Sequence, residues 1–217
     1  MTPKQRLSWF AHLFKAITNQ DHKHLRPVFA PYIPVDGVVL DVGAHAGQFS
    51  KLFSGMVPRG EVLAFEPSAY ARSILEPALR FSNARNVKVV AKGLSDCPSK
   101  MTLSTPIKRS GSLGFGVATL GQTDREAHAQ VVDLITLDSL KLQRVDFIKA
   151  DIEGWEYHML RGGHDTIAAC KPAIFMEINK TALSRAGSSE SQIRDFLGDL
   201  GYVSHLVSEE DFLFVSR

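Results

Sequence analysis

The chain has 217 residues, of which 44% are apolar and 22% charged, and its formal net charge is +2. These values suit one soluble domain with a short appendage, whose core needs no disulfide or metal for stability. The small net charge and the absence of a Lys/Arg-rich run give no indication of nucleic-acid binding. No run approaches the ~18 apolar residues of a membrane span, so we expect no stable membrane insertion. Cys97 and Cys170 lack CxxC or zinc spacing, and with no secretory signal they predict reduced thiols in a cytoplasmic protein.

Residues 1–36 are expected to form an N-terminal helical arm and linker. Within it, residues 2–18 predict an amphipathic helix, because Leu7, Phe10, Phe14 and Ile17 recur at helical spacing. The simplest interpretation is a helix packed on the following domain. The alternatives are a substrate cap, an arm for homo-oligomer formation, or a membrane-surface helix.

Residues 37–217 alternate strand-like and helical segments, which is typical of a mostly parallel sheet covered on both faces. The expected strands are Val38–Val42, Val62–Phe65, Val87–Ala91, Phe147–Ile152, Ala173–Ile178, Tyr202–Val207 and Phe212–Val215. The expected helices are Gln48–Met56, Ala69–Phe81, Trp155–Arg161 and Ser191–Leu200. Only four residues separate the last two strands, so they should form a hairpin that makes one edge strand antiparallel. A glycine-rich insertion at residues 105–130 is a candidate lid.

The first strand ends in a glycine turn, LDVGAHAG at residues 40–47. A dinucleotide fingerprint, GxGxxG, needs a second glycine where His45 stands, which impairs a phosphate cradle. S-adenosylmethionine (SAM) carries no phosphate and does not need one. We therefore expect Asp41 to meet the SAM ammonium group directly or through water, and Gly43, Ala44 and Gly47 to shape the cofactor site.

The next two strands end in further candidate cofactor residues. Glu66 lies 19 positions after Gly47, where a carboxylate accepts hydrogen bonds from ribose hydroxyls, and Pro67 follows it. Ser95 and Asp96 follow the third strand, where the adenine would lie. The alternative interpretations are a helix cap or a surface carboxylate for Glu66 and a capped turn for Asp96.

The fourth strand carries Lys149, Asp151 and Glu153, an unusual set in a buried strand, because unpaired charge is costly inside a protein. Asp151 and Glu153 should lie beyond the carboxyl end of the strand, where ligands bind in open α/β sheets. They are the candidate catalytic residues, one of them as general base. The alternative is an ion pair between Lys149 and Asp151 or an acid on a neighbouring strand.

The fifth strand ends in Glu177 and Asn179, which share one face. Together with Asp151 they could bind a divalent metal such as magnesium through oxygen. The alternative is a carboxylate paired with Lys149 and an amide that caps a turn.

In chain order, the segments LDVGAHAG (40–47), AFEP (64–67), GLSD (93–96), TLD (136–138) and FIKADIEGWE (147–156) resemble FkbM-type methyltransferases. LRGG (160–163) and PAIFME (172–177) continue the resemblance. It implies a Rossmann-like class I methyltransferase that uses SAM, usually on a hydroxyl oxygen. The expected acceptor is thus a hydroxyl group on a small molecule or glycan. The 36 N-terminal residues and most of the glycine-rich insertion fall outside the resemblance.

Two other functions are compatible with a glycine turn of this kind. An NAD(P)-dependent dehydrogenase is disfavoured by His45 and by the terminal hairpin. A SAM-binding module without activity is disfavoured because acids follow both the second and the fourth strand.

Overall fold

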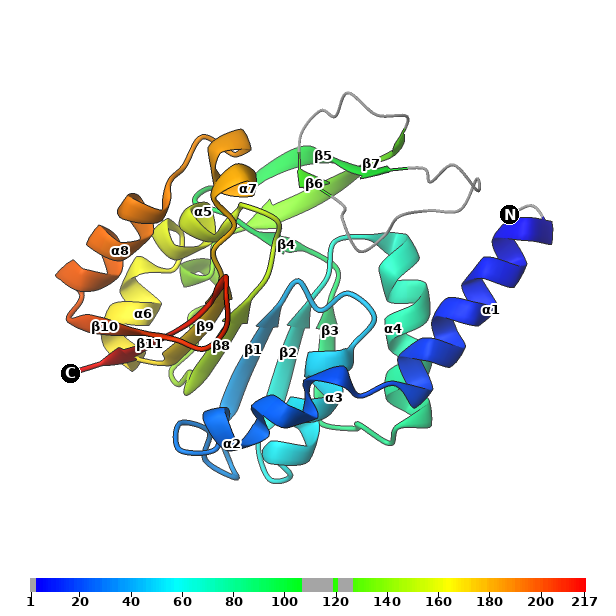
Figure 1. The fold of residues 1–217 in the computed structure, drawn as a ribbon, viewed down its shortest axis with the longest axis horizontal. Coiled ribbons are helices and arrows are strands. Elements are labelled where there is room, and N and C mark those ends of the chain that lie inside the picture. Colours follow the sequence, from blue (N-terminus) through cyan, green and yellow to red (C-terminus); the bar gives the residue numbers. More distant parts are fainter. Residues whose placement is uncertain (1–2, 107–118, 121–126) are drawn as a thin grey trace.

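The computed structural model describes residues 3–106, 119–120 and 127–217, which form two β-sheets with helices around the larger one (Figure 1). The larger sheet has seven strands in the order β10-β11-β9-β8-β1-β2-β3. Its strands are β1 (Val38–Val42), β2 (Glu61–Phe65), β3 (Val87–Val90), β8 (Phe147–Ala150), β9 (Ala173–Glu177), β10 (Tyr202–Leu206) and β11 (Asp211–Ser216). The pairs among β3, β2, β1, β8 and β9 are all parallel, so the predicted Rossmann-like sheet is confirmed.

The terminal hairpin forms as predicted, but its position corrects one expectation. β11 pairs antiparallel with both β10 and β9, so the antiparallel strand lies inside the sheet and β10 forms the edge. The reason is burial: consecutive residues Leu213 and Phe214 are 3% and 2% exposed and belong to cores on opposite faces. A strand that buries both of its faces is stabilised by neighbours on both sides.

Helices cover both faces of the main sheet because successive strand residues point to opposite sides. In β1, Val39 joins one core and Leu40 the other. The Val39 side is covered by η1 (Asp21–Leu25), α2 (Arg26–Phe29), α3 (Gln48–Met56) and α4 (Ala69–Phe81). The Leu40 side is covered by α5 (Glu156–Arg161), α6 (His164–Cys170) and α8 (Glu190–Asp199). Two short helices, η3 (Asp138–Leu140) and α7 (Lys180–Arg185), lie in connections.

The predicted N-terminal helix is α1 (Pro3–Thr18), which packs against α4 at one side of the molecule (Figure 1). Its packed face contains Trp9, Leu13 and Ile17, which follow one another at four-residue intervals. Three other apolar residues of α1 are mostly exposed: Leu7 (74%), Phe10 (62%) and Phe14 (70%). The helix was therefore predicted correctly, but of the four apolar residues expected on its packed face only Ile17 lies there. Within the described residues, no helix is long and apolar enough to cross a bilayer.

A second, smaller sheet lies beyond the carboxyl ends of β1 and β2 (Figure 1). Its strands are, in spatial order, β4 (Gly93–Leu94), β7 (Ala127–Ile135), β5 (Ser99–Pro106) and β6 (Thr119–Leu120). Residues 107–118 and 121–126 lie outside the described part of the chain, and with them most of the insertion predicted to act as a lid.

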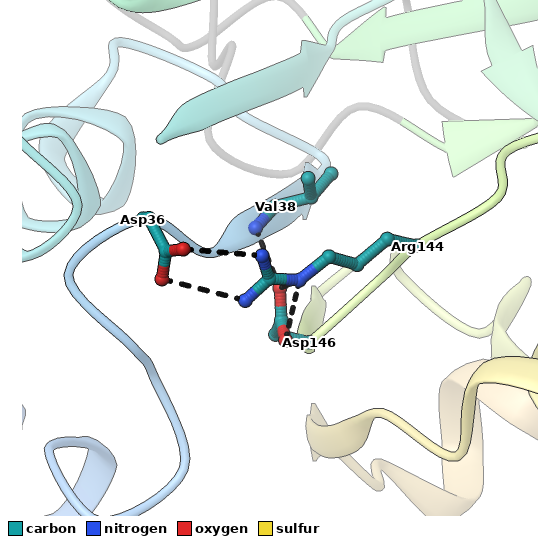
Figure 2. Close-up of polar contacts among 4 residues, drawn as sticks. All are labelled: Asp36, Val38, Arg144 and Asp146. Carbon is teal, nitrogen blue, oxygen red and sulfur yellow. Dashed lines mark hydrogen bonds and ion pairs between the residues drawn. The ribbon is translucent and has the colours of Figure 1, made fainter. Parts of the chain in front are cut away.

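Ion pairs and hydrogen bonds fix the amino ends of β1 and β8 (Figure 2). The Asp146 carboxylate accepts a hydrogen bond from the Val38 amide at 2.7 Å and pairs with Arg144 at 2.9 Å. The same guanidinium contacts Asp36 at 3.4 Å and lowers the pKa of that exposed carboxyl through hydrogen bonding. This cluster lies at the end of the strands opposite to the one that carries the candidate site residues.

Candidate active site

A pocket of about 250 Å³ lies at the carboxyl ends of β1, β2 and β8. This is the position at which open α/β sheets bind ligands. Its wall is formed by the turn after β1, the start of α3, the segments after β2 and β8, part of η1, and apolar side chains of the second sheet.

The glycine turn after β1 forms one wall through Gly43 and Ala44. Gly43 has φ +76°, and a Cβ atom there would lie 2.0 Å from the Asp151 carbonyl oxygen, so only glycine fits. Gly47 serves packing instead of lining the pocket. It has φ +85°, and a Cβ would lie 2.5 Å from Leu75 of α4.

Asp41, expected to meet the SAM ammonium group directly or through water, is not among the residues that line the pocket. Its side chain is fully buried, pairs with Lys149 at 3.3 Å and accepts a hydrogen bond from Ser50 at 2.5 Å. Lys149 is 2% exposed and also donates to the carbonyl oxygens of Val42 and Gly43, at 3.2 and 2.8 Å. Asp41 is therefore the neighbouring-strand acid that neutralises Lys149, because an unpaired buried ammonium would be strongly destabilising.

Glu66 and Pro67, directly after β2, both line the pocket. The two carboxylate oxygens of Glu66 accept backbone hydrogen bonds, one from His45 and one from Ser68, each at 2.8 Å. Burial raises the pKa of Glu66, although these hydrogen bonds and the charge of Lys149 act in the opposite direction. The carboxylate is thus held in place by two donors and keeps further lone pairs for a ligand.

Ser95 and Asp96 lie behind the pocket wall. The Ser95 hydroxyl accepts a hydrogen bond from the Trp155 indole at 3.1 Å, and Trp155 lines the pocket. Asp96 pairs with Arg161 at 3.3 Å and lies 3.6 Å from the His158 ring, which stacks on Trp155. The two residues expected to contact adenine therefore position an aromatic side chain that can do so.

The loop after β8 places the candidate catalytic acids on the pocket. β8 ends at Ala150, two residues earlier than predicted, and both Asp151 and Glu153 line the pocket. Glu153 has φ +56°, a conformation rare for a residue other than glycine. The Glu156 carboxylate fixes this loop by accepting hydrogen bonds from the Ile152 and Gly154 amides, at 3.0 and 3.3 Å. Burial raises the pKa of Glu156 to about 7.

Glu177, at the end of β9, lies against Asp151 rather than Lys149. Burial and the neighbouring charge of Asp151 raise the pKa of Glu177 to about 8. Asn179 is occupied elsewhere: its carbonyl oxygen accepts from the Ala182 amide and caps α7, while its amide donates to Glu210. The predicted magnesium ligands are therefore not assembled, and no group of three acids, histidines or cysteines in the described ranges is arranged to hold a metal.

Sequence reasoning missed several pocket residues. His22 and Asp21 come from η1, Phe49 and Gln48 from the first turn of α3, and Leu103 and Leu120 from the second sheet. Gln48 and Phe49 directly follow the glycine turn, so their position could have been inferred. The contribution of the N-terminal arm depends on tertiary packing and leaves no signal in the sequence.

Comparison with known proteins identifies the family. The family model described as "Methyltransferase FkbM domain" matches residues 41–204. The chain belongs to the FkbM methyltransferase family. The resemblance found in the sequence motifs is thereby confirmed, and the FkbM domain covers the pocket except for the part contributed by the N-terminal arm.

Two curated proteins are similar in sequence to this chain. The chain is 28% identical to AmbE, the AMB antimetabolite synthetase of Pseudomonas aeruginosa, over 78% of its own length but 10% of AmbE. It is 28% identical to Methyltransferase 1 of Beauveria bassiana, spanning 63% of this chain and 61% of that protein.

An FkbM methyltransferase structure from Methylobacillus flagellatus superposes with a TM-score of 0.56 at 14% identity, covering 98% of this chain and 59% of that one. SMU.1697c of Streptococcus mutans, whose structure contains S-adenosylhomocysteine (SAH), gives 0.55 at 9% identity over 90% of this chain and 96% of that one. These two likenesses show the fold.

Replacing Asp41 with Asn should destabilise the protein, because Lys149 would lose its buried counter-charge. We expect the free energy of unfolding to fall by about 3–5 kcal/mol. Urea unfolding followed by circular dichroism measures the change. Asp36→Asn, in the exposed pair with Arg144, is the control and should change the unfolding midpoint little. An equally small effect of Asp41→Asn would contradict the role assigned to the buried pair.

Glu177 should make stability depend on pH. The pKa of Glu177 in the folded protein is raised to about 8. Its contribution to the free energy of unfolding is therefore complete below its ordinary pKa and is lost as the pH rises toward 8. Between pH 5 and pH 8, the decrease in the free energy of unfolding should be smaller in Glu177→Gln than in the wild type by about 1 kcal/mol, with solvent screening taken into account. Urea titrations at both pH values test this, with the exposed Glu209→Gln as control. Parallel pH profiles in wild type and Glu177→Gln would show that the raised pKa is wrong.

Proposed function

We propose that this FkbM domain transfers a methyl group from SAM to a hydroxyl oxygen of a small molecule or glycan. The observation that carries the proposal is the placement of two acids on either side of the glycine turn. Glu66 follows β2 and Asp151 follows β8, and β1 lies between these strands. A carboxylate for the ribose and a carboxylate for the acceptor thus lie at opposite sides of one pocket.

The pocket residues fit SAM group by group. The side-chain amide oxygen of Gln48 (Oε1) is buried and has no hydrogen-bond partner within the described ranges, so it can accept a hydrogen bond from an ammonium group. No side chain caps the amino end of α3, and its free amides suit a carboxylate. Glu66 can accept from ribose hydroxyls, and the Trp155 ring offers an apolar surface for adenine.

When bound, SAM supplies an electrophilic methyl group, and the protein's contribution is alignment. Asp151 would accept a hydrogen bond from the acceptor hydroxyl and direct its oxygen toward the methyl. Glu153 beside it adds a second negative charge, which disfavours anionic acceptors. The Trp155 and Phe65 side chains would exclude water from the wall next to the cofactor.

The alternatives fit the pocket less well. A dinucleotide needs close backbone approach at the turn, but His45 occupies that position, with φ +50°. A binding module without activity would not need Asp151 and Glu153 facing the cavity.

Calorimetry with SAM and with NAD tests the cofactor assignment, and Glu66→Gln tests the ribose contact. We expect the protein to bind SAM and not NAD. Losing the charged acceptor should weaken SAM binding by about 1.5–3 kcal/mol. Glu76→Gln, an exposed acid on α4, is the control and should bind SAM as the wild type does. Full affinity in a folded Glu66→Gln protein would remove Glu66 from the site.

Tritium transfer from methyl-labelled SAM tests the reaction on sugars, hydroxy acids and phenols, with amines and thiols as contrasting acceptors. Label should enter hydroxyl compounds. In Asp151→Asn, turnover should fall about 100-fold while SAH affinity changes much less, because charge next to the reacting hydroxyl is lost. Transfer to amines or thiols alone would refute the hydroxyl assignment, and wild-type turnover in Asp151→Asn would remove Asp151 from the mechanism.

A further inference from the structure

The N-terminal arm supplies part of the pocket wall, although it precedes the region matched by the FkbM family model. Asp21 and His22 line the pocket from η1. This segment is held at both ends. The Lys51 ammonium of α3 donates to backbone carbonyls of residues 16, 17 and 19 at the end of α1, and Leu25 is buried in the core under η1. His22 is therefore presented to the pocket by an anchored turn.

The His22 ring lies flat on Phe49, with ring centroids 4.0 Å apart and planes inclined by 12°. The Lys149 ammonium lies 5.2 Å from the centre of the same Phe49 ring. Neither ring nitrogen of His22 forms a hydrogen bond with any part of the chain that the structure describes. A half-buried imidazole of this kind keeps both its lone pair and its N–H for a ligand.

The charged groups around His22 favour its neutral form. Burial lowers the pKa of His22 most, followed by the positive charge of Lys149 from β8, with a smaller effect of His24 in the same turn. Asp21 beside it and Asp151 after β8 act in the opposite direction. The net effect is a pKa below the ordinary value near 6.5, so His22 is a neutral base at pH 7.

These neighbours also place His22 within the pocket. Of the groups on other elements that act on His22, Lys149 lies on β8 and Asp151 directly follows that strand. His22 and Asp151 therefore line the same pocket, and the charge of Asp151 acts on the imidazole.

We infer that His22 is the catalytic residue that takes the proton from the acceptor hydroxyl, an inference that rests on the proposed function. The acceptor O–H bond breaks and its proton goes to an imidazole nitrogen. The oxygen electron pair forms the new bond to the methyl carbon, and the bond from that carbon to sulfur breaks with its electrons left on sulfur. Asp151 orients the hydroxyl and balances the imidazolium charge. A neutral imidazole is a better base at pH 7 than an ordinary carboxylate, so this replaces the expectation that Asp151 or Glu153 is the base.

NMR titration of the histidine rings tests the state of His22 without any acceptor. His22→Gln assigns its signal, and His24, exposed in the same 3-10 turn, is the internal reference. We expect His22 to titrate below 6.5, and its signal to shift when SAH is added. A His22 pKa at or above 6.5, or a signal insensitive to SAH, would overturn the inference.

The pH dependence of kcat/KM separates the proton acceptor from the orienting acid. In wild type and in Asp151→Asn the rate should rise with pH through the pKa of His22. His22→Ala should lose this rise and about 100-fold in kcat, with SAH affinity changed less than about threefold. Added imidazole should restore part of the lost rate, and His24→Gln should match wild type.

The controls keep this inference distinct from the proposed function. Absence of methyl transfer by the wild-type enzyme would refute the function. Transfer that continues in His22→Ala with an unchanged pH profile would refute only the role of His22. A loss of SAH binding as large as the loss of kcat, without rescue by imidazole, would show that His22 is a structural part of the wall.

Discussion

The buried ion pair between Asp41 and Lys149 is the interaction on which the site depends. It joins the two central strands, β1 and β8, where both side chains are almost completely withdrawn from water. Burying two charges is costly, and an apolar pair would often be as stable. Lys149 does more than neutralise Asp41, because it also donates to the carbonyls of Val42 and Gly43 and so fixes the turn that forms the pocket wall. The same turn is held from the other side by Glu66, through the His45 amide.

Lys149 also acts on other titratable groups that line the pocket. Since Asp41 neutralises Lys149, the acid that follows β8 is free to interact with its own neighbours. Asp151 adds to the effect of burial on Glu177 and raises its pKa to about 8, so one of these two carboxyls carries a proton at neutral pH. The pKa of His22 is meanwhile lowered first by burial and then by the charge of Lys149, which contacts the same Phe49 ring. The buried cation thus acts on the basic side of the pocket, whereas burial and the neighbouring acids act on Glu177.

Local sequence patterns were sufficient to predict the positions of residues that directly follow a strand. A parallel strand ends where its apolar run ends, so the positions of Glu66 and Asp151 at the carboxyl edge followed from sequence. The residue that a side chain contacts cannot be predicted from a local pattern in the same way. Asp41 was expected to face the ligand because it ends a strand, yet the register of β1 and β8 places it opposite Lys149. His22 reaches the pocket only because the arm folds back over α3, a contact between segments that no local spacing records.

The loop after β8 shows why so many residues of the KADIEGWE segment carry specific chemistry. Gly154 has φ +101°, and a Cβ there would lie 2.3 Å from the Ala182 carbonyl oxygen, so the loop must lie directly against α7. In the same loop Glu153 adopts a left-handed conformation, and the Glu156 carboxylate accepts hydrogen bonds from the Ile152 and Gly154 amides. The buried Glu156 carboxylate therefore stabilises a turn with an unfavourable backbone conformation. In this turn Glu153 lines the pocket together with Asp151. The motif specifies a backbone shape first, and its two pocket acids depend on that shape.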